Sequence, residues 1–159
     1  KFKIVLLSAN SNYSLIKKQI KRYKPNYFVI NDKAVCEKIK KKYQKNKVKI
    51  YNKFSDVNLK KIKFDITISA IVGIAGLDPT IKFTNISKKV LLANKEAYVV
   101  AGELLNSLAE LNESTIFPID SEHSAIHQCL SGISGSRAQN GSGLYFRVPH
   151  SAPDPLKKS

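Results

Sequence analysis

Short apolar runs alternate along the chain with segments whose apolar positions recur every three or four residues. The first run, residues 2–8, predicts a strand, and the segment from Asn12 to Tyr23 places apolar residues at helical spacing behind an asparagine cap. The alternation continues, with strands predicted at 26–30, 48–52, 64–72, 90–94 and 115–119 and helices at 32–43, 55–61, 78–87, 95–111 and from 122. Such alternation is typical of βαβ units with right-handed crossovers and a mainly parallel sheet.

The same pattern predicts which residues face the core. The strand at 64–72 is apolar throughout, which predicts a strand covered on both faces, as parallel sheets require. Helical spacing gives the inner stripes of the first two helices. These are Leu15, Ile16, Gln19, Ile20 and Tyr23 in the first, and Ala34, Val35, Ile39 and Tyr43 in the second.

Length and composition describe an ordinary globular protein. The 159 residues are about one domain's worth, 43% of them apolar and 25% charged. No apolar run approaches the roughly 20 residues of a membrane-spanning helix, so we expect no membrane partner. Cys36 and Cys129 are too few for a disulfide scaffold, which favours a reducing compartment. The absence of methionine predicts a piece of a longer protein.

The net charge of +15 belongs to one half of the chain. Residues 1–63 hold 19 of the 27 basic groups and three of the 12 acids. Nearly all of these bases are lysines, and Arg22 is the one arginine among them able to make a bidentate phosphate contact. Lysine and asparagine enrichment from an A and T rich genome is favoured over a nucleic-acid-binding surface, although a basic binding module stays open as an alternative.

Four turns between a strand and the following helix are the places to seek chemistry, because ligands of parallel sheets bind at the carboxyl ends of the strands. They are residues 8–12, 70–76, 94–96 and 120–123. In the last, Asp120 and Glu122 lie two apart at a strand end with Ser121 between them, which suits Mg²⁺ or Mn²⁺. Helix capping is the alternative. His123 and His127 lack the order of a zinc protease motif.

The turn at 94–96 offers a second group of polar residues. Asn94, Lys95 and Glu96 follow a predicted strand, so they should face the same crevice as the 120–123 turn. Lys95 is suited to bind an anionic substrate group, whereas the alternative makes Asn94 a helix cap and the other two solvated surface. Gly73 and Gly76 do not form a Gly-x-Gly-x-x-Gly phosphate loop.

Three segments in order, SAIVGIAGLDPT, LLANKEAYVVAG and FPIDSEHSAIHQCL, closely resemble the 1-deoxy-D-xylulose 5-phosphate reductoisomerase family. The resemblance runs from about Phe2 to Leu130. It implies an NADPH-dependent and divalent-metal-dependent enzyme that rearranges and reduces its phosphorylated sugar to 2-C-methyl-D-erythritol 4-phosphate in isoprenoid synthesis. The implied fold is α/β, with a Rossmann-like mainly parallel sheet and helices on both faces, running into the start of an α+β catalytic domain.

The resemblance also implies roles for matched residues. NADPH would contact Asn10, Ser11, Asn12, Asn94 and Glu96, and the absence of an acid in the first three suits the 2′-phosphate of NADP. The metal, Mn²⁺ or Mg²⁺, would bind Asp120 and Glu122. The substrate would contact Lys95, Ser121, Glu122 and Ser142, with Lys95 and Glu122 as the catalytic residues.

The family pattern predicts that this chain is incomplete. A glycine-rich phosphate loop should precede residue 1, and a third carboxylate ligand and a helical domain should follow the irregular tail at 133–159, so the chain alone is expected to be inactive. The expected division is a cofactor domain at 1–118 and the start of a catalytic domain at 119–159. A cytoplasmic or plastid homodimer is implied. A non-catalytic α/β interaction domain is the remaining alternative.

Overall fold

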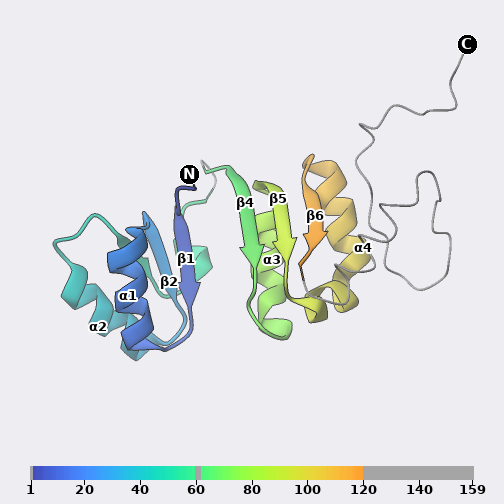
Figure 1. The fold of residues 1–159 in the computed structure, drawn as a ribbon. Helices are drawn as coiled ribbons and strands as arrows, with labels where there is room; N and C mark the ends of the chain where they lie inside the picture. Colours follow the sequence, from blue (N-terminus) through green and yellow to red (C-terminus); the bar gives the residue numbers. More distant parts are fainter. Residues whose placement is uncertain (1, 60–61, 120–159) are drawn as a thin grey trace, which may run out of the picture. The chain divides into compact units, whose positions relative to one another are not determined.

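A computed structural model describes residues 2–59 and 62–119 of the chain (Figure 1). The chain divides into two compact units, Lys1–Leu59 and Lys60–Ser159. Each unit has a three-stranded parallel sheet in which the strands lie side by side in sequence order. Each step from one strand to its neighbour therefore needs a crossover connection, and in both units helices supply it.

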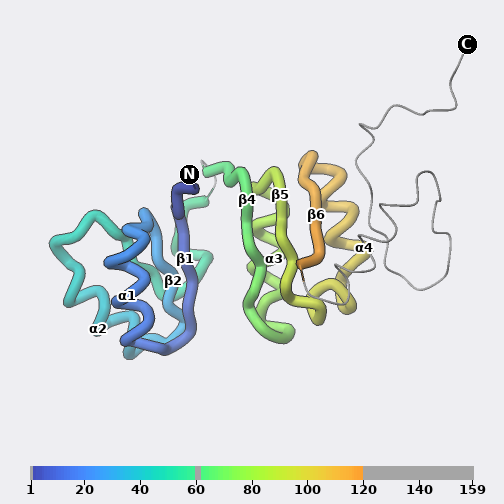
Figure 2. Tube along the Cα trace, viewed as in Figure 1, coloured from blue at the N-terminus to red at the C-terminus, as the bar shows by residue number. Residues whose placement is uncertain are grey.

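The first unit follows the order strand, helix, strand, helix, strand (Figure 2). Asn12 and Asp32 cap its two long helices, because each side chain accepts a hydrogen bond from the backbone N–H three residues later, at 3.0 and 2.8 Å. The elements are β1 (Leu6–Ala9), α1 (Tyr13–Tyr23), β2 (Tyr27–Ile30), α2 (Lys33–Tyr43), β3 (Lys49–Tyr51) and the short 3₁₀ helix η1 (Phe54–Asp56).

One apolar cluster holds the first unit together. Phe28 and Ile30 lie two apart on β2, so both point to the face on which α1 and α2 pack. The helices contribute Ile16, Ile20, Cys36, Ile39 and Tyr43. Two right-handed crossovers between strands that progress in one direction place both helices on the same face.

Three predictions about the inner faces of these helices are wrong. Leu15 and Tyr23 are 47% and 40% exposed, and Ala34 is exposed as well. All three lie at the edges of the predicted apolar faces. Only the middle of each face is buried, because each helix contacts the sheet along a narrow strip of its surface. Cys36, which the stripe omitted, is fully buried.

Burial of the Cys36 side chain has a consequence for pH dependence. Burial raises the pKa of this thiol above its ordinary value. The unfolded chain therefore loses the thiol proton first as the pH rises, so this contribution to stability is present below about pH 8.5 and falls above it. We expect the stability advantage of the parent over Cys36→Ala to shrink between pH 8 and 10, measured by urea unfolding in a Cys129→Ser background. A constant difference would contradict the prediction.

The second unit repeats the alternation. The residues of α3 and α4 meet β5 and β6 in one cluster, in which Leu92, Tyr98 and Leu105 are buried. The helix α4 has non-helical backbone angles at Ala101, next to Gly102, and is therefore kinked. The elements are β4 (Phe64–Ser69), η2 (Ile74–Gly76), α3 (Leu77–Thr84), β5 (Ser87–Leu92), α4 (Lys95–Leu111) and β6 (Thr115–Pro118).

The strands β4 and β5 differ from their predictions. β4 ends at Ser69, and Ile66 and Ile68 on it are 39% and 64% exposed, so the prediction of a strand covered on both faces is wrong for the described residues. The reason is that β4 turns its other face to α3. β5 begins at Ser87, earlier than predicted, because Ser87 already pairs with Phe64 of β4 in the parallel ladder.

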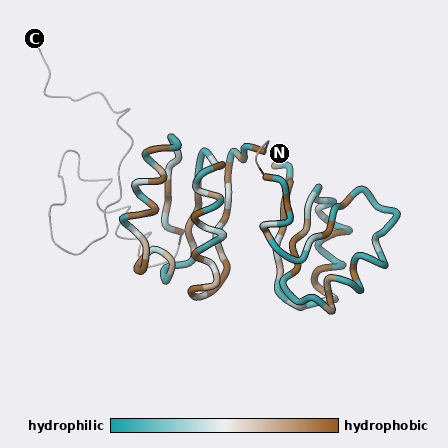
Figure 3. Tube along the Cα trace, turned by 180° about the vertical axis from the view of Figure 1, so that it is seen from behind, coloured by the Kyte–Doolittle hydropathy of each residue, from teal (hydrophilic) through white to brown (hydrophobic). Residues whose placement is uncertain are grey.

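The α/β, Rossmann-like, parallel architecture predicted from the sequence is confirmed. Lysine-rich segments of the first unit are exposed, and Figure 3 shows the connection from α2 to β3 mostly in teal, the hydrophilic end of its scale. Within residues 2–59 and 62–119, no helix is both long and apolar enough to cross a membrane. The predicted helix from 122 and the irregular tail at 133–159 lie outside the described residues.

Candidate functional site

A pocket opens in the second unit at the carboxyl ends of β4 and β5. It has a volume of about 260 Å³ and lies where β5 passes into the first turn of α4. Its wall is formed by two short segments, Ala70–Ile71–Val72 after β4 and Ala93–Asn94–Lys95–Glu96 after β5. The fold therefore brings the predicted turns 70–76 and 94–96 together, at the sheet edge where parallel sheets bind ligands.

Asn94 is the buried polar residue of this pocket, with 2% of its surface exposed. Its side-chain oxygen accepts a hydrogen bond from Ala97 N at 2.9 Å and so caps α4. Its side-chain nitrogen donates two hydrogen bonds across the turn, a short one to Ile71 O and one of 2.9 Å to Gly73 O. The capping role, one of the two alternatives that the sequence offered, is therefore observed, and the same side chain also ties the 70–76 turn to the start of α4.

The turn between β4 and α3 depends on two glycines. Gly73 has φ +73° and ψ −168°, a conformation that side-chain-bearing residues rarely adopt. Gly76 is buried, and a Cβ atom there would overlap both the side-chain nitrogen of Asn94 and the carbonyl oxygen of Ile71. These glycines let the turn pass close to Asn94, which is a different use from the phosphate loop that the sequence excluded.

Buried hydroxyls fix the other side of the same turn. Thr80 Oγ1 donates to Gly76 O at 2.6 Å, and Ser69 Oγ lies 2.6 Å from Thr80 Oγ1. Because the Thr80 proton is used on Gly76 O, Ser69 is the donor in that contact. The end of β4, the turn and the first turn of α3 are therefore joined by a continuous chain of hydrogen bonds.

Lys95 and Glu96 stand at the mouth of the pocket, and both are exposed. Neither side chain forms an ion pair with another residue of the described part of the chain. The first turn of α4 thus places a cation and an anion on adjacent residues. Asn94, Lys95 and Glu96 all line this pocket, whereas their binding roles and the crevice that they are expected to share with the 120–123 turn stay predictions.

In the first unit, the predicted residues follow β1. Asn10 and Ser11 are exposed, and Asn12 is exposed while its side-chain oxygen caps α1. The Asn10 side-chain oxygen accepts a hydrogen bond of 3.4 Å from Asn31 Nδ2, which joins the ends of β1 and β2. This edge presents amide and hydroxyl groups, which can donate hydrogen bonds to an anion.

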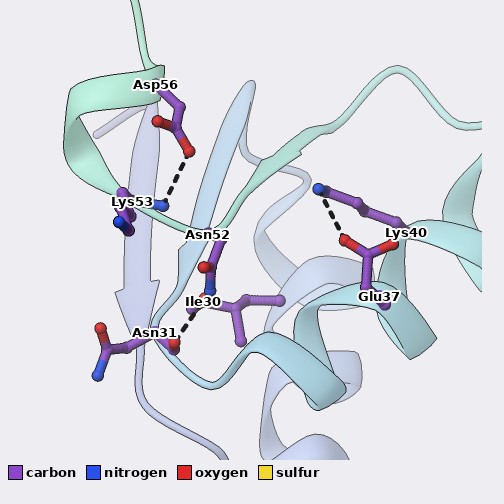
Figure 4. A network of polar contacts seen from close by, with 7 residues as sticks. All are labelled: Ile30, Asn31, Glu37, Lys40, Asn52, Lys53 and Asp56. Carbon is purple, nitrogen blue, oxygen red and sulfur yellow. Dashed lines mark hydrogen bonds and ion pairs between the residues drawn. The ribbon is translucent and has the colours of Figure 1, made fainter.

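Sequence reasoning missed two residues of this edge. Asn31 directly follows β2 and Asn52 directly follows β3, just as Asn10 follows β1. Asn52 Nδ2 donates to Ile30 O at 2.8 Å and to Asn31 O at 2.9 Å, so it ties the ends of β2 and β3 together (Figure 4). The sequence did contain a signal for them, because an asparagine lies at or close to the end of each of the three predicted strands.

The predicted metal and substrate residues Asp120, Ser121, Glu122 and Ser142 lie outside the described residues, as do His123 and His127. Within residues 2–59 and 62–119, no group of three or more histidine, cysteine, aspartate or glutamate side chains is placed to hold a metal ion. The metal site therefore stays a prediction that depends on the 120–123 turn.

Comparison with known proteins connects these edges to a family. The family model for 1-deoxy-D-xylulose 5-phosphate reductoisomerase matches residues 1–102. A reductoisomerase of that name from Thermodesulfovibrio yellowstonii is 40% identical over 133 residues, covering 83% of this chain and 35% of the relative. One from Clostridium novyi is 41% identical over 138 residues, covering 84% and 36%. The chain thus spans about a third of the length of these relatives.

Solved structures give the same result. A reductoisomerase from Zymomonas mobilis in complex with NADPH has a TM-score of 0.73 and 32% identity, covering 80% of this chain and 34% of that one. A DOX-P reductoisomerase in complex with NADPH, fosmidomycin and magnesium has a TM-score of 0.73 and 29% identity, covering 81% and 32%. The fold, the order of the site segments and the family match agree, and the chain belongs to the 1-deoxy-D-xylulose 5-phosphate reductoisomerase family.

Proposed function

We propose that this chain is the cofactor-binding part of an enzyme that converts 1-deoxy-D-xylulose 5-phosphate to 2-C-methyl-D-erythritol 4-phosphate with NADPH and Mg²⁺ or Mn²⁺. The observation that carries the proposal is the family match over residues 1–102, which includes both polar strand edges. The complexes of relatives with NADPH and magnesium support these cofactors. When bound, the metal would polarise substrate oxygens and NADPH would supply a hydride.

The first unit would bind the adenosine end of NADPH. The chemistry of the edge fits a 2′-phosphate, because Asn10, Ser11 and Asn12 bring amide and hydroxyl donors and no carboxylate. The one nearby acid in the next turn, Asp32, is engaged as the cap of α2. A phosphate at this edge would therefore meet the amide and hydroxyl donors of residues 10–12, while the Asp32 carboxylate is held against the backbone of α2.

The second unit would bind the nicotinamide end and the substrate. Glu96 would border the nicotinamide, and Lys95 would attract an anionic group of the substrate as a mobile point charge. Asp120 and Glu122 would hold the metal, and Ser121, Glu122 and Ser142 would contact the substrate. The expected division into a cofactor domain at 1–118 and a catalytic domain from 119, the homodimer and the cytoplasmic or plastid location belong to the same proposal.

The adenosine site is tested with 2′-phospho-AMP and 5′-AMP as probes. We expect 2′-phospho-AMP to bind the chain at least tenfold more tightly than 5′-AMP, with amide shifts in NMR spectra centred on residues 10–12. Ser11→Asp should remove this preference, because a carboxylate would then face the phosphate.

The matched control is Ser107→Asp, which adds the same charge on an exposed position of α4 in the other unit. It should leave the preference unchanged. Equal affinity of the parent chain for both probes, or NMR shifts confined to the lysines of α2, would contradict the proposed cofactor site. Either result would favour the alternative of a basic, nucleic-acid-binding surface.

A further inference from the structure

We propose that Asn94 is a positioning residue, whose carboxamide holds the 70–76 turn as the wall of the pocket and does not itself bind the cofactor through its side chain. The identity of the ligand in this inference rests on the proposed function. The way in which the pocket wall is fixed rests on the observed contacts of Asn94. It revises the expectation from the family resemblance that Asn94 is a direct cofactor contact.

The side chain has no N–H group left for a ligand. An asparagine side chain carries two N–H donors, and here they go to Ile71 O and Gly73 O. The orientation of the amide is fixed by its partners, because the oxygen faces a backbone N–H while the nitrogen faces two carbonyl oxygens. With 2% of the residue exposed, a ligand would have to break these bonds to reach the amide.

A cap alone does not require asparagine. Aspartate and serine cap helices about as well, and in the first unit Asp32 caps α2 with a 2.8 Å bond. What asparagine adds at position 94 is a donor group on the side opposite the cap. That group links α4 to the segment after β4, and Ile71 in this segment lines the pocket directly.

The space around the carboxamide is shaped for it. Gly76 leaves the room that the Asn94 nitrogen occupies, since a Cβ there would overlap that atom. Thr80 holds Gly76 O from below through its hydroxyl. The turn is thus held from the α4 side by Asn94 and from the α3 side by Thr80.

Asn94→Asp separates the two roles of the residue. The carboxylate keeps the acceptor for Ala97 N but places negative charge against two carbonyl oxygens in place of two hydrogen bonds. We expect the amides of residues 71–76 to exchange with deuterium at least tenfold faster than in the parent chain, while the first turn of α4 keeps its protection. Binding of NADPH to the same chain should weaken to a similar degree.

Asn85→Asp is the matched control, because Asn85 is exposed, lies in the same unit and uses its side-chain oxygen as the acceptor for Asn112. It should leave exchange in the turn and NADPH affinity unchanged. Parent-like exchange of residues 71–76 in Asn94→Asp would overturn the inference. So would faster exchange there together with undiminished NADPH binding, whereas a parent chain that fails to bind NADPH would count against the proposed function alone.

Discussion

Replacing Gly76 by alanine is expected to lower the free energy of unfolding of the second unit by about 3 kcal/mol. The added Cβ would overlap Asn94 and Ile71, so either the turn moves or the carboxamide leaves its position. Both outcomes forfeit buried hydrogen bonds whose partners are then left unsatisfied. Urea unfolding followed by far-UV circular dichroism, with deuterium exchange of the α4 amides assigning the loss to this unit, measures the effect.

Gly102→Ala is the control for the effect of an added methyl group in the same unit. Gly102 lies in α4, and a Cβ there would meet mainly the ring of Tyr98 at 3.3 Å. The higher helix propensity of alanine offsets this contact, so the unfolding free energy should stay within about 1 kcal/mol of the parent value. Equal losses of unfolding free energy in the two variants would contradict the prediction that the space beside Asn94 requires glycine at position 76.

Neutralising either predicted metal ligand is the second change with a large expected effect. Asp120→Asn or Glu122→Gln should weaken Mn²⁺ binding to the chain at least tenfold, because each removes a charged oxygen ligand of a hard cation. Titration with Mn²⁺, read from the electron paramagnetic resonance signal of the free ion, measures this directly. In an active form of the enzyme the same substitutions should nearly abolish turnover.

Asp78→Asn is the control, because it removes one negative charge, as Asp120→Asn and Glu122→Gln do. Asp78 is exposed in the first turn of α3 and pairs with Lys82 at 2.9 Å, where an exposed ion pair contributes at most about 1 kcal/mol. It should leave Mn²⁺ affinity unchanged. Unchanged affinity in both Asp120→Asn and Glu122→Gln would return these acids to the role of helix caps.

The sequence by itself determined the order of elements and the caps. The apolar runs and the asparagine or aspartate before each long helix act locally, so α1, α2 and α4 begin where the pattern predicts, at Tyr13, Lys33 and Lys95. The parallel arrangement followed as well, because regular alternation of strands and helices is typical of parallel βαβ units. Two of the three family segments pointed to the turns at 70–76 and 94–96, which the structure brings together at one pocket.

Only the tertiary structure decided which faces are covered and which polar groups are shared. Cys36 is buried and Ile68 is exposed because of where helices pack across the sheets. The local pattern of apolar residues does not tell a covered face of a sheet from an uncovered one. The role of Asn94 depends on carbonyl groups 21 and 23 residues away in the chain. Sequence spacing carries no information on such contacts, because they exist only once two strand ends lie side by side and a glycine lets them approach.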